Sequence, residues 1–296
     1  MTEVFFGIDG GGSGTRAAYA PRDGAIRGRG AAESSNLTSY ETLAAERIVA
    51  AASEAARAAG ADNGDLARIF SASHAVLGLA GSNIDAAAAA RVSARLPFGS
   101  LRIVSDSETA LAGALGDADS DGALALLGTG SVYIARRGGE IFRLGGWGFM
   151  GGDQSSGAVI GFEAVRESLL AHDGVTPRTP LTTAILEEFG GDAPRLALFA
   201  ASATPRDFAG YAPRVFAGAR DGDETAAAII ARALSALEAT LAALCPERSP
   251  RLFLLGGLSG LYAPLLSSRW RGCLSEPLGD ALEGAILLAR GERGGG

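Results

Sequence analysis

The sequence holds one short unit of structure in two copies, and this repeat limits the folds open to the chain. In the first copy an apolar run at 4–8 leads into a glycine-rich turn at 9–15. A second apolar segment follows at 16–20, then the turn PRDG, then a third segment at 25–29. Short apolar runs separated by glycine and proline turns are typical of β-strands. The start of the chain is therefore predicted to be a three-stranded meander around one glycine loop of the size that holds a phosphate.

The second copy repeats this order in the middle of the chain. An apolar run at 123–127 leads into the turn GTGS at 128–131, a strand at 132–136, a glycine pair and a strand at 140–144. Segments with helical periodicity follow each copy. A length of 296 residues fits two domains, since one domain has about 150 residues. The repeat predicts an α/β fold of two duplicated lobes that face each other across a central cleft.

The other segments alternate as an α/β fold requires. Ser39 is expected to cap a helix at 40–59, and Asp106 is expected to open a helix that runs to Leu115. Further elements expected in the first lobe are a strand at 69–79, a helix at 84–95 and a strand at 101–105. Those expected later are helices at 155–172, 181–189, 205–219 and 224–244, a strand at 252–255 and a helix at 278–290.

These elements give the expected boundaries of the lobes. The N-terminal lobe is expected to contain residues 1–115 together with residues 278–296, because the final helix folds back onto it. The C-terminal lobe is expected to contain residues 116–277.

The basic residues exclude several kinds of chemistry. All 26 are arginine, because the chain has no lysine. A Walker A loop, the protein-kinase catalytic set and Schiff-base enzymes each need a lysine. His74 and His172 are too few for a multi-histidine metal site, and Cys245 and Cys273 are too few for a cysteine-bound zinc or iron–sulfur site. Catalysis is therefore expected to use carboxylates, hydroxyls, arginines and backbone amides.

The overall charge and the apolar segments bear on partners and location. A net charge of −7 and a pI near 5.0 argue against nucleic acid or an anionic membrane as a partner. The start MTEVFFGIDGGG lacks the basic flank and the long apolar run of a signal peptide. No run reaches about 18 apolar residues without a charge or a glycine. With so few cysteines, a cytoplasmic protein with no membrane partner is expected.

The two glycine turns are candidate phosphate sites. Without side chains the backbone can curl so that successive N–H groups point into one concavity, which favours an anion. A carboxylate at the end of the first strand, Asp9, is placed to hold Mg²⁺. Either turn alone is also consistent with an ordinary hairpin, but the pair favours phosphate binding. The candidate nucleotide-binding residues in the two turns are Gly10, Gly11, Gly12, Ser13, Gly14, Thr15, Gly128, Thr129 and Gly130.

Asp106 is the candidate catalytic residue. It follows a predicted strand and opens a helix, and open α/β sheets place their chemistry at such strand ends. An aspartate there can orient a hydroxyl and accept its proton during phosphoryl transfer. The residues alone fit equally well with a helix N-cap, with Thr109 three positions further on.

The segment GGWGFMGGD is the candidate sugar site. The glycines around Trp147 bring no side chains to a core, so the indole could offer a flat apolar wall to a sugar. Asp153 could accept hydrogen bonds from sugar hydroxyls. The alternative is a structural tryptophan that braces the loop.

The DGGG loop and the GTGS turn resemble those of the sugar kinase, actin and heat-shock ATPase superfamily. Within it, the string LLGTGSVYIARRGGEIFRLGGWGFMGGDQSSG is similar to the N-acetylglucosamine kinase and BadF/BadG-type ATPase family. The resemblance spans nearly the whole chain. It implies a two-lobed actin-like ATPase fold, which is a duplicated ribonuclease H-like fold, with ATP and Mg²⁺ as cofactors.

The resemblance also implies roles for particular residues. Asp106 would be the general base that acts on the 6-hydroxyl of the sugar. The residues implied to bind the amino sugar are Asn36, Asp106, Gly146, Trp147, Gly148 and Asp153. Those implied to border the nucleoside are Ala209, in the sequence FAG, and Gly256 and Gly257, at a strand end.

One departure from the family pattern leaves a question open. The loop GGGSGTR is two residues longer than the short family form GGGTR. Either Ser13 or Thr15 could therefore supply the phosphate-facing hydroxyl, and Arg16 fits a phosphate ligand or an exposed strand residue.

These observations lead to one expected function and one alternative. The expected function is phosphorylation of N-acetylglucosamine or glucosamine at the 6-hydroxyl, and the sequence leaves open which of these sugars is used. The alternative is an ATPase activator of the BadF type, although the cysteine motif that holds its iron–sulfur cluster is missing. An apolar helix face in the second lobe fits a homodimer or a core equally well.

Overall fold

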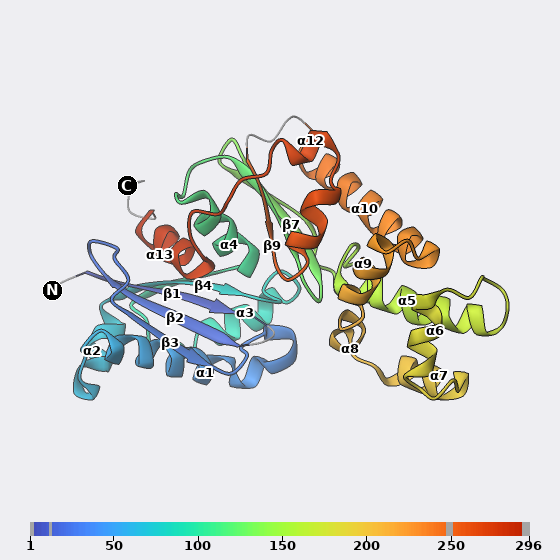
Figure 1. Cartoon of the computed structure of the whole chain (residues 1–296). Helices are drawn as coiled ribbons and strands as arrows, with labels where there is room; N and C mark the ends of the chain where they lie inside the picture. The colour runs from blue at the N-terminus through green and yellow to red at the C-terminus, as the bar shows by residue number, and fades with distance from the viewer. Residues whose placement is uncertain (1–2, 12–13, 247–250, 292–296) are drawn as a thin grey trace. The chain divides into compact units, whose positions relative to one another are not determined.

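The computed structural model describes residues 3–11, 14–246 and 251–291. The chain forms two compact units (Figure 1). Unit 1 consists of Met1–Gly122 and Glu276–Gly296, and unit 2 of Ala123–Ser275. Each unit has its own sheet and its own hydrophobic core, and each is described by itself below.

Unit 1 is built on a five-stranded sheet with the order β3-β2-β1-β4-β5. Its strands are β1 (Val4–Gly10), β2 (Thr15–Pro21), β3 (Gly28–Ala32), β4 (Ser73–Leu79) and β5 (Ser100–Val104). β1 is antiparallel to β2 and parallel to β4, and β4 is parallel to β5. Asp9 lies opposite Gly78, and Gly78 lies opposite Val104. The carboxyl ends of three neighbouring strands therefore meet at one edge of this sheet.

Helices cover both faces of this sheet (Figure 1). They are α1 (Leu37–Ala58), α2 (Leu66–Ser71), α3 (Ala86–Ser93), α4 (Asp106–Leu115) and α13 (Ala281–Gly291), with a short 3₁₀ turn at Asn63–Asp65. Phe6 of β1 packs with Ile48 of α1 on one face, and Phe5 packs with Leu282 of α13 on the other. Because successive strand residues point to opposite faces and both faces are buried, β1 is a nearly continuous apolar run.

The prediction of the third strand at 25–29 was wrong in position. The turn before it is longer than expected, since the Ala25 N–H donates to Asp23 Oδ1 at 2.9 Å. The strand begins where glycine permits close contact with α1. A Cβ on Gly28 would lie only 2.0 Å from the carbonyl oxygen of Ala55. Contact with a distant helix therefore decides where β3 begins.

Two helix boundaries in unit 1 also differ from the predictions. Asn36, rather than Ser39, caps α1, and its Oδ1 accepts from the Thr38 N–H at 2.9 Å. The helix then kinks at Tyr40, where φ is −140° and ψ is 30°, so its regular part starts later than its cap. The strand predicted at 69–79 begins only at β4, because its first residues belong to α2.

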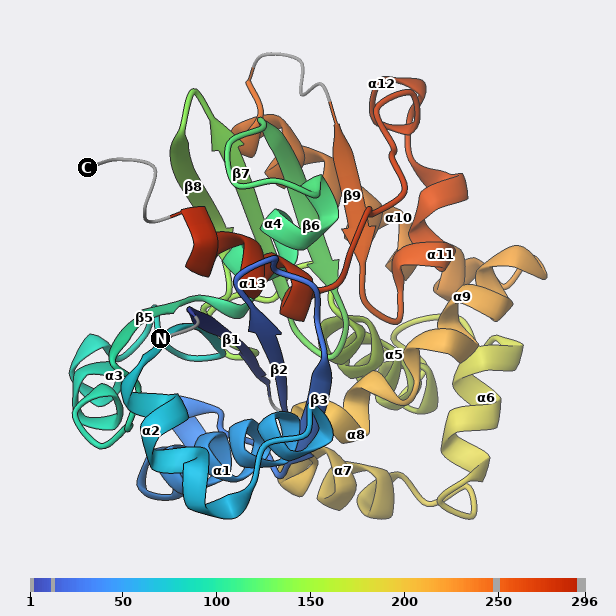
Figure 2. The same cartoon turned by 90° about the vertical axis from the view of Figure 1, so that its left-hand side faces the viewer.

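Unit 2 is built on a four-stranded sheet with the order β8-β7-β6-β9 (Figure 2). Its strands are β6 (Gly122–Leu127), β7 (Ser131–Arg137), β8 (Glu140–Gly145) and β9 (Leu252–Leu255). β6 is parallel to β9, and β7 is antiparallel to β8. Three consecutive strands beside a later parallel strand thus occur in both units, as β3-β2-β1-β4 and β8-β7-β6-β9. This arrangement confirms the duplicated α/β fold.

The rest of unit 2 is helical. Its helices are α5 (Gly157–His172), α6 (Pro180–Glu187), α7 (Ala193–Ser202), α8 (Pro205–Ala209), α9 (Ala212–Arg220), α10 (Glu224–Leu244), α11 (Ser259–Tyr262) and α12 (Ser268–Arg271), with a 3₁₀ turn at Ala263–Leu265. The segment 205–219, predicted as one helix, is two helices that are separated near Gly210, and α7 was not predicted. By length and composition α10 could cross a membrane. Its buried residues, such as Leu237 and Leu241, belong to the core of unit 2, and a core helix passes the same test.

Candidate active site

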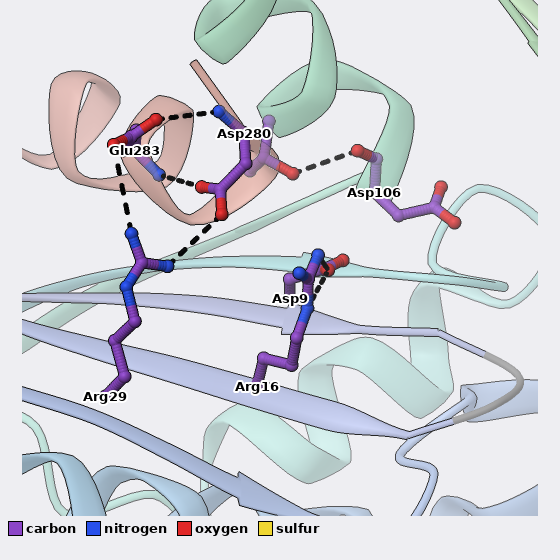
Figure 3. Close-up of polar contacts among 7 residues, drawn as sticks. Asp9, Arg16, Arg29, Asp106, Asp280 and Glu283 are labelled. Atoms are coloured by element: carbon purple, nitrogen blue, oxygen red, sulfur yellow. Dashed lines mark hydrogen bonds and ion pairs between the residues drawn. The ribbon is translucent and has the colours of Figure 1, made fainter. Parts of the chain in front are cut away.

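Asp9, the candidate metal ligand, is part of an ion pair at the edge of the unit 1 sheet (Figure 3). Arg16 lies directly opposite it on β2, and its Nη2 and Nε contact Asp9 Oδ2 at 2.5 and 3.1 Å. The hydrogen bond to Asp9 raises the pKa of Arg16. The register of the β1–β2 hairpin therefore places the exposed Arg16 beside Asp9, where it orients the Asp9 carboxylate.

The glycine turn after β1 begins at a residue that packs closely against its neighbours in unit 1. Gly10 leaves too little room for a side chain without a shift of its neighbours, because a Cβ there would lie 2.2 Å from Ser35 Oγ and 2.6 Å from Leu79 Cδ2. The Gly11 N–H donates to the Gly14 carbonyl at 3.0 Å. Gly12 and Ser13 lie outside the described residues. The turn therefore follows the end of β1 with no side chain between its backbone and Ser35.

Thr15 is buried at the start of β2. Its hydroxyl donates to the Glu33 carbonyl at 2.7 Å and lies 2.8 Å from Ser35 Oγ. In this structure the hydroxyl of Thr15 is therefore used inside unit 1. A role for it on a phosphate would require these two contacts to change.

Asp106 is the first residue of α4, as predicted, but it is not the N-cap. Ser105 is the cap, and its Oγ accepts from the Glu108 N–H at 3.2 Å. Asp106 Oδ1 accepts from the N–H of Ser107 at 2.8 Å. The carboxylate points away from α13 in Figure 3. Because Asp106 comes two residues after the end of β5, it lies at the same edge of the sheet as Asp9.

Asn36 lies at this edge as well. The N–H of Leu37 donates to the carbonyl of Ala80, just after β4, at 3.0 Å. Asn36 Oδ1 accepts from the N–H and the hydroxyl of Thr38, at 2.9 and 2.6 Å. The structure therefore brings Asp9, Asn36 and Asp106 together at the carboxyl ends of β1, β4 and β5, with the acceptor oxygen of Asn36 engaged by its own helix.

In unit 2 the GTG turn is joined to the start of α5. The Gly128 N–H donates to the Gly130 carbonyl at 2.9 Å and closes the turn. The carbonyls of Gly128 and Thr129 accept from the N–H groups of Gly157 and Ala158, at 2.8 and 3.2 Å. The first N–H groups of a helix lack partners within the helix, and here the turn supplies them. Thr129 itself is exposed.

Asp153 lies directly against this turn. Its Oδ1 accepts from the Ser131 N–H at 3.3 Å, and a Cβ on Gly130 would lie 2.8 Å from its Oδ2. The side chain is buried, and this burial raises the pKa of Asp153 while the bond from Ser131 opposes the shift. The backbone of Asp153 has a φ of 58°, and that of Ser155 a φ of 70°. Such values are uncommon without glycine and occur often at functional sites.

Hydroxyl groups hold this unusual backbone in place. Gln154 is fixed through its carbonyl, which accepts from Ser131 Oγ at 2.7 Å and from Tyr133 Oη at 3.1 Å. The carbonyl of Ser155 accepts from Tyr262 Oη at 2.8 Å. The segment that carries Asp153 is therefore fixed from several sides by the core of unit 2.

Trp147, the candidate sugar wall, is 71% exposed. Phe149 instead anchors the loop, and its ring packs against Phe208 with centroids 5.6 Å apart. Gly146 and Gly148 have φ of 71° and 81°, values that other residues rarely adopt. The loop is tied to β7 through the Gly146 N–H, which donates to the Ser131 carbonyl at 3.0 Å. The indole of Trp147 is therefore accessible, and Phe149 provides the packing that anchors the loop.

The candidate nucleoside residues lie around the end of β6. A Cβ on Gly157, which starts α5, would lie 3.2 Å from both Ala209 Cβ and the Gly128 carbonyl oxygen. Gly256, with a φ of 93°, is packed so closely that a Cβ would lie 2.3 Å from the Leu127 carbonyl oxygen. Gly257 follows it, and a Cβ there would meet open space. The GTG turn, Asp153, Ala209 and the Gly256 turn therefore form one group of residues in unit 2.

Two residues near Asp106 were not singled out as site residues from the sequence. Thr109 Oγ1 donates to the carbonyl of Asp106 at 2.9 Å, and the same side chain covers Gly78 of β4. Thr109 was considered only as a capping partner, and Gly78 is one small residue in an apolar strand. Their contact depends on how α4 packs on the sheet, so no local pattern predicts it.

A cluster of charges surrounds the start of α13. Asp280 and Glu283 accept from each other's N–H groups, at 2.9 and 2.8 Å. Arg29 of β3 contacts Asp280 at 3.2 Å and Glu283 at 3.8 Å (Figure 3). These contacts fix the first turn of α13 above the sheet of unit 1.

The donor set suits a magnesium ion bound mainly through substrate. Among the residues that the structure describes, no group of three or more His, Cys, Asp or Glu side chains gathers as a metal site. Mg²⁺ in phosphoryl-transfer sites is usually bound by one or two carboxylates, by water and by substrate phosphates. Asp9, at a strand end beside the glycine turn, fits that role.

One described cavity lies away from these groups. It has a volume of about 530 Å³ and is lined by residues of the segment 177–179, of α6, of α9 and of the start of α10, among them Arg178 and Arg214. None of the candidate residues lines it. The candidate site is therefore defined by the strand ends and the glycine turns.

Two units of repeated strand order, each with a glycine turn at a strand end, define an actin-like ATPase fold. The chain belongs to the BadF/BadG/BcrA/BcrD ATPase family, whose sequence profile matches residues 6–289. It is 32% identical to the glucosamine kinase of Vibrio cholerae serotype O1 over 286 residues, which are 96% of this chain and 95% of that one.

Solved structures agree with this assignment. A candidate N-acetylglucosamine kinase from Chromobacterium violaceum superposes with a TM-score of 0.85 and is 32% identical, covering 97% of this chain and 98% of that one. A ROK family glucokinase from Streptomyces griseus, solved with glucose and AMPPNP, has a TM-score of 0.57 and is 21% identical. The superposition covers 97% of this chain and 99% of the glucokinase chain, and it shows that the two proteins share a fold.

Proposed function

We propose that this protein is an ATP-dependent amino-sugar kinase that transfers the γ-phosphoryl group of ATP to the 6-hydroxyl of glucosamine or N-acetylglucosamine. The observation that carries the proposal is the position of Asp106, at the carboxyl edge of the unit 1 sheet beside Asp9 and Asn36. The identity of 32% to a glucosamine kinase along 96% of the chain supports the choice of sugar.

Asp106 is proposed to act as the general base. In phosphoryl transfer the transition state is loose, so the protein contributes mainly position and charge stabilisation. A carboxylate hydrogen-bonded to the 6-hydroxyl orients the oxygen towards the phosphorus and accepts its proton as the new bond forms. Ser105, which caps α4, leaves the Asp106 side chain out of the cap, as this role requires.

The other candidate residues are proposed to bind. Asn36, Trp147, Asp153 and the backbone at Gly146 and Gly148 would hold the sugar. The backbone N–H groups of the two glycine turns would bind the ATP phosphates, and Ala209, Gly256 and Gly257 would border the nucleoside. When bound at Asp9, Mg²⁺ would neutralise charge on the phosphates.

The structure does not favour the alternative of an ATPase activator with an iron–sulfur cluster. The chain has two cysteines, Cys245 and Cys273. Both are buried in the core of unit 2, where neither is placed to bind a cluster at a surface.

The function is tested by coupled ADP release with a panel of sugars. The panel contains glucosamine, N-acetylglucosamine, N-acetylmuramic acid, N-acetylmannosamine and glucose, with 6-deoxyglucosamine as the matched control that lacks the acceptor hydroxyl. We expect glucosamine or N-acetylglucosamine to give the largest stimulation and the 6-deoxy sugar to give none. If no amino sugar stimulates ADP release, the proposed function is wrong.

A further inference from the structure

The position of the Asp106 carboxylate depends on the first turn of α4. Asp106 is the first helical residue, and its Oδ1 bonds to the N–H of the next residue, Ser107, at 2.8 Å. That bond moves with the helix. Whatever fixes the first turn of α4 against the sheet therefore also fixes the carboxylate relative to the strand ends.

Thr109 makes this attachment. Its side chain is completely buried, and its Oγ1 donates to the Asp106 carbonyl at 2.9 Å. It also occupies the space above Gly78, since a Cβ there would lie 2.3 Å from Thr109 Oγ1 and 2.9 Å from Cγ2. Gly78 is the residue of β4 that lies opposite Asp9. One side chain thus joins the backbone of Asp106 to the strand beside Asp9.

The opposite side of α4 leaves it no room to move away from the sheet. A Cβ on Gly284 of α13 would lie 1.9 Å from the Thr109 carbonyl oxygen. A Cβ on Gly113 of α4 would lie 1.9 Å from the Asp280 carbonyl oxygen. The backbone of α4 is therefore in direct contact with that of the α13 segment, while Thr109 rests on β4. A displacement of α4 would therefore be passed on to β4 and α13, because closely packed interiors have low compressibility and transmit strain.

We propose that Thr109 is a positioning residue for Asp106, which holds the carboxylate at its working distance from the Asp9 edge of the sheet. The inference rests on the proposed function, because it assumes that Asp106 is the base. The hydroxyl of Thr109 fixes the Asp106 carbonyl, and its methyl group and Cβ set the spacing between α4 and Gly78.

The main test compares two substitutions of similar size. Thr109→Val keeps the shape but removes the donor, and Thr109→Ser keeps the donor but removes the methyl group. We expect Thr109→Val to lower kcat about tenfold while KM for ATP changes less than about twofold, because small displacements of a catalytic group act on kcat. Thr109→Ser should keep more activity than Thr109→Val. An unchanged kcat in Thr109→Val would overturn the inference and leave the proposed function intact.

A double-mutant cycle separates positioning from general stability. In the Asp106→Asn background, Thr109→Val should lower the residual rate little further, because the residue it acts through is already lost. The same fold-loss in both backgrounds would overturn the inference. If Asp106→Asn itself retains the wild-type kcat, Asp106 is not the base, and the inference about Thr109 is wrong with it.

A second variant tests the spacing from the strand side. Gly78→Ala should displace Thr109 and lower kcat by about 10- to 100-fold, since a misplacement of 1 Å can cost that much. Gly78→Ala with Thr109→Ala should be more active than Gly78→Ala alone, because the added methyl group then has more room. A double variant no more active than Gly78→Ala would contradict the proposal. Thermal melting of each variant shows whether unit 1 is folded.

Discussion

The two units place a carboxylate beside a glycine turn in different ways. In unit 1, Asp9 is held by an ion pair with Arg16 from the neighbouring strand. In unit 2, Asp153 is buried against the turn, with a φ of 58° and a backbone hydrogen bond from Ser131. Burial disfavours the ionised form of the Asp153 carboxylate and raises its pKa.

The two units share some properties of the repeat and differ in others. Both keep the strand order, and in both a glycine-rich stretch of sequence follows the first of the repeated strands. The surroundings of the two carboxylates differ, however, because Asp9 has a charged partner and Asp153 is buried. The unit 1 carboxylate pairs with a neighbouring arginine, and the unit 2 carboxylate lies buried against the turn. The comparison therefore predicts that equivalent substitutions in the two turns change stability and ligand binding by different amounts.

The largest effect is expected at the unit 1 turn. Gly10→Ala would place a Cβ 2.2 Å from Ser35 Oγ and 2.6 Å from Leu79 Cδ2, both within the packed interior. Overpacking of this kind costs about 1–3 kcal/mol of unfolding free energy. ATP affinity should fall as well, and isothermal titration with thermal melting measures both. Gly11→Ala is the matched control for stability, because a Cβ there meets no atom within 4 Å, and equal losses of unfolding free energy in the two variants would contradict this account.

A smaller effect is expected at the equivalent turn of unit 2. A Cβ on Gly130 would lie 2.8 Å from Asp153 Oδ2, a longer distance than the 2.2 Å at Gly10, so a smaller displacement relieves the contact. We expect Gly130→Ala to raise KM for the sugar more than it lowers stability, because Asp153 must move. Gly128→Ala, into open space, is the control. Steady-state kinetics with sugar and ATP varied separately measure this effect. An unchanged KM for the sugar in Gly130→Ala would contradict the expectation.

Asp153→Asn should change how stability depends on pH. Burial raises the pKa of Asp153 in the folded protein. Its contribution to stability is therefore full below the unfolded pKa of about 3.9 and is lost as pH rises through the folded pKa. The amide keeps the acceptor for Ser131 without the buried charge, so Asp153→Asn should be more stable than wild type at neutral pH.

Thermal melting between about pH 4 and pH 8 tests this difference, since the titration of a carboxyl lies at the low end of that range. The gain in Tm should shrink as the pH falls. A gain that stays constant with pH would mean that charge is not its cause, because asparagine also tolerates a positive φ better than most residues.

The smallest effect is expected at Arg29. Its contacts with Asp280 and Glu283 are exposed, and surface ion pairs contribute about 0–1 kcal/mol. Arg29→Ala should therefore change the unfolding free energy by less than about 1 kcal/mol in urea titrations, and less still at high salt. A larger loss would show that the start of α13 depends on this cluster more than its exposure implies.

The local motifs of the fold and site could be predicted from the sequence. The GTG turn after β6 and the start of α4 at Asp106 depend on a few adjacent residues, and the structure has both at the predicted positions. Features that depend on packing between distant segments could not be predicted. Contact with α1 moves the start of β3 to Gly28, and the contact of Thr109 with Gly78 joins α4 to β4. The pairing of Arg16 with Asp9 is intermediate, because it needs only the register of one hairpin.

The most direct test of the whole account is a comparison of the wild type with Asp106→Ala and Asp106→Asn. Removal of a general base lowers kcat by about 10²- to 10⁴-fold. The account predicts that loss of sugar phosphorylation with nearly unchanged ATP affinity, and it predicts that ³¹P NMR of the wild-type product shows the phosphate on the 6-oxygen. Undiminished sugar phosphate production by either variant would contradict it.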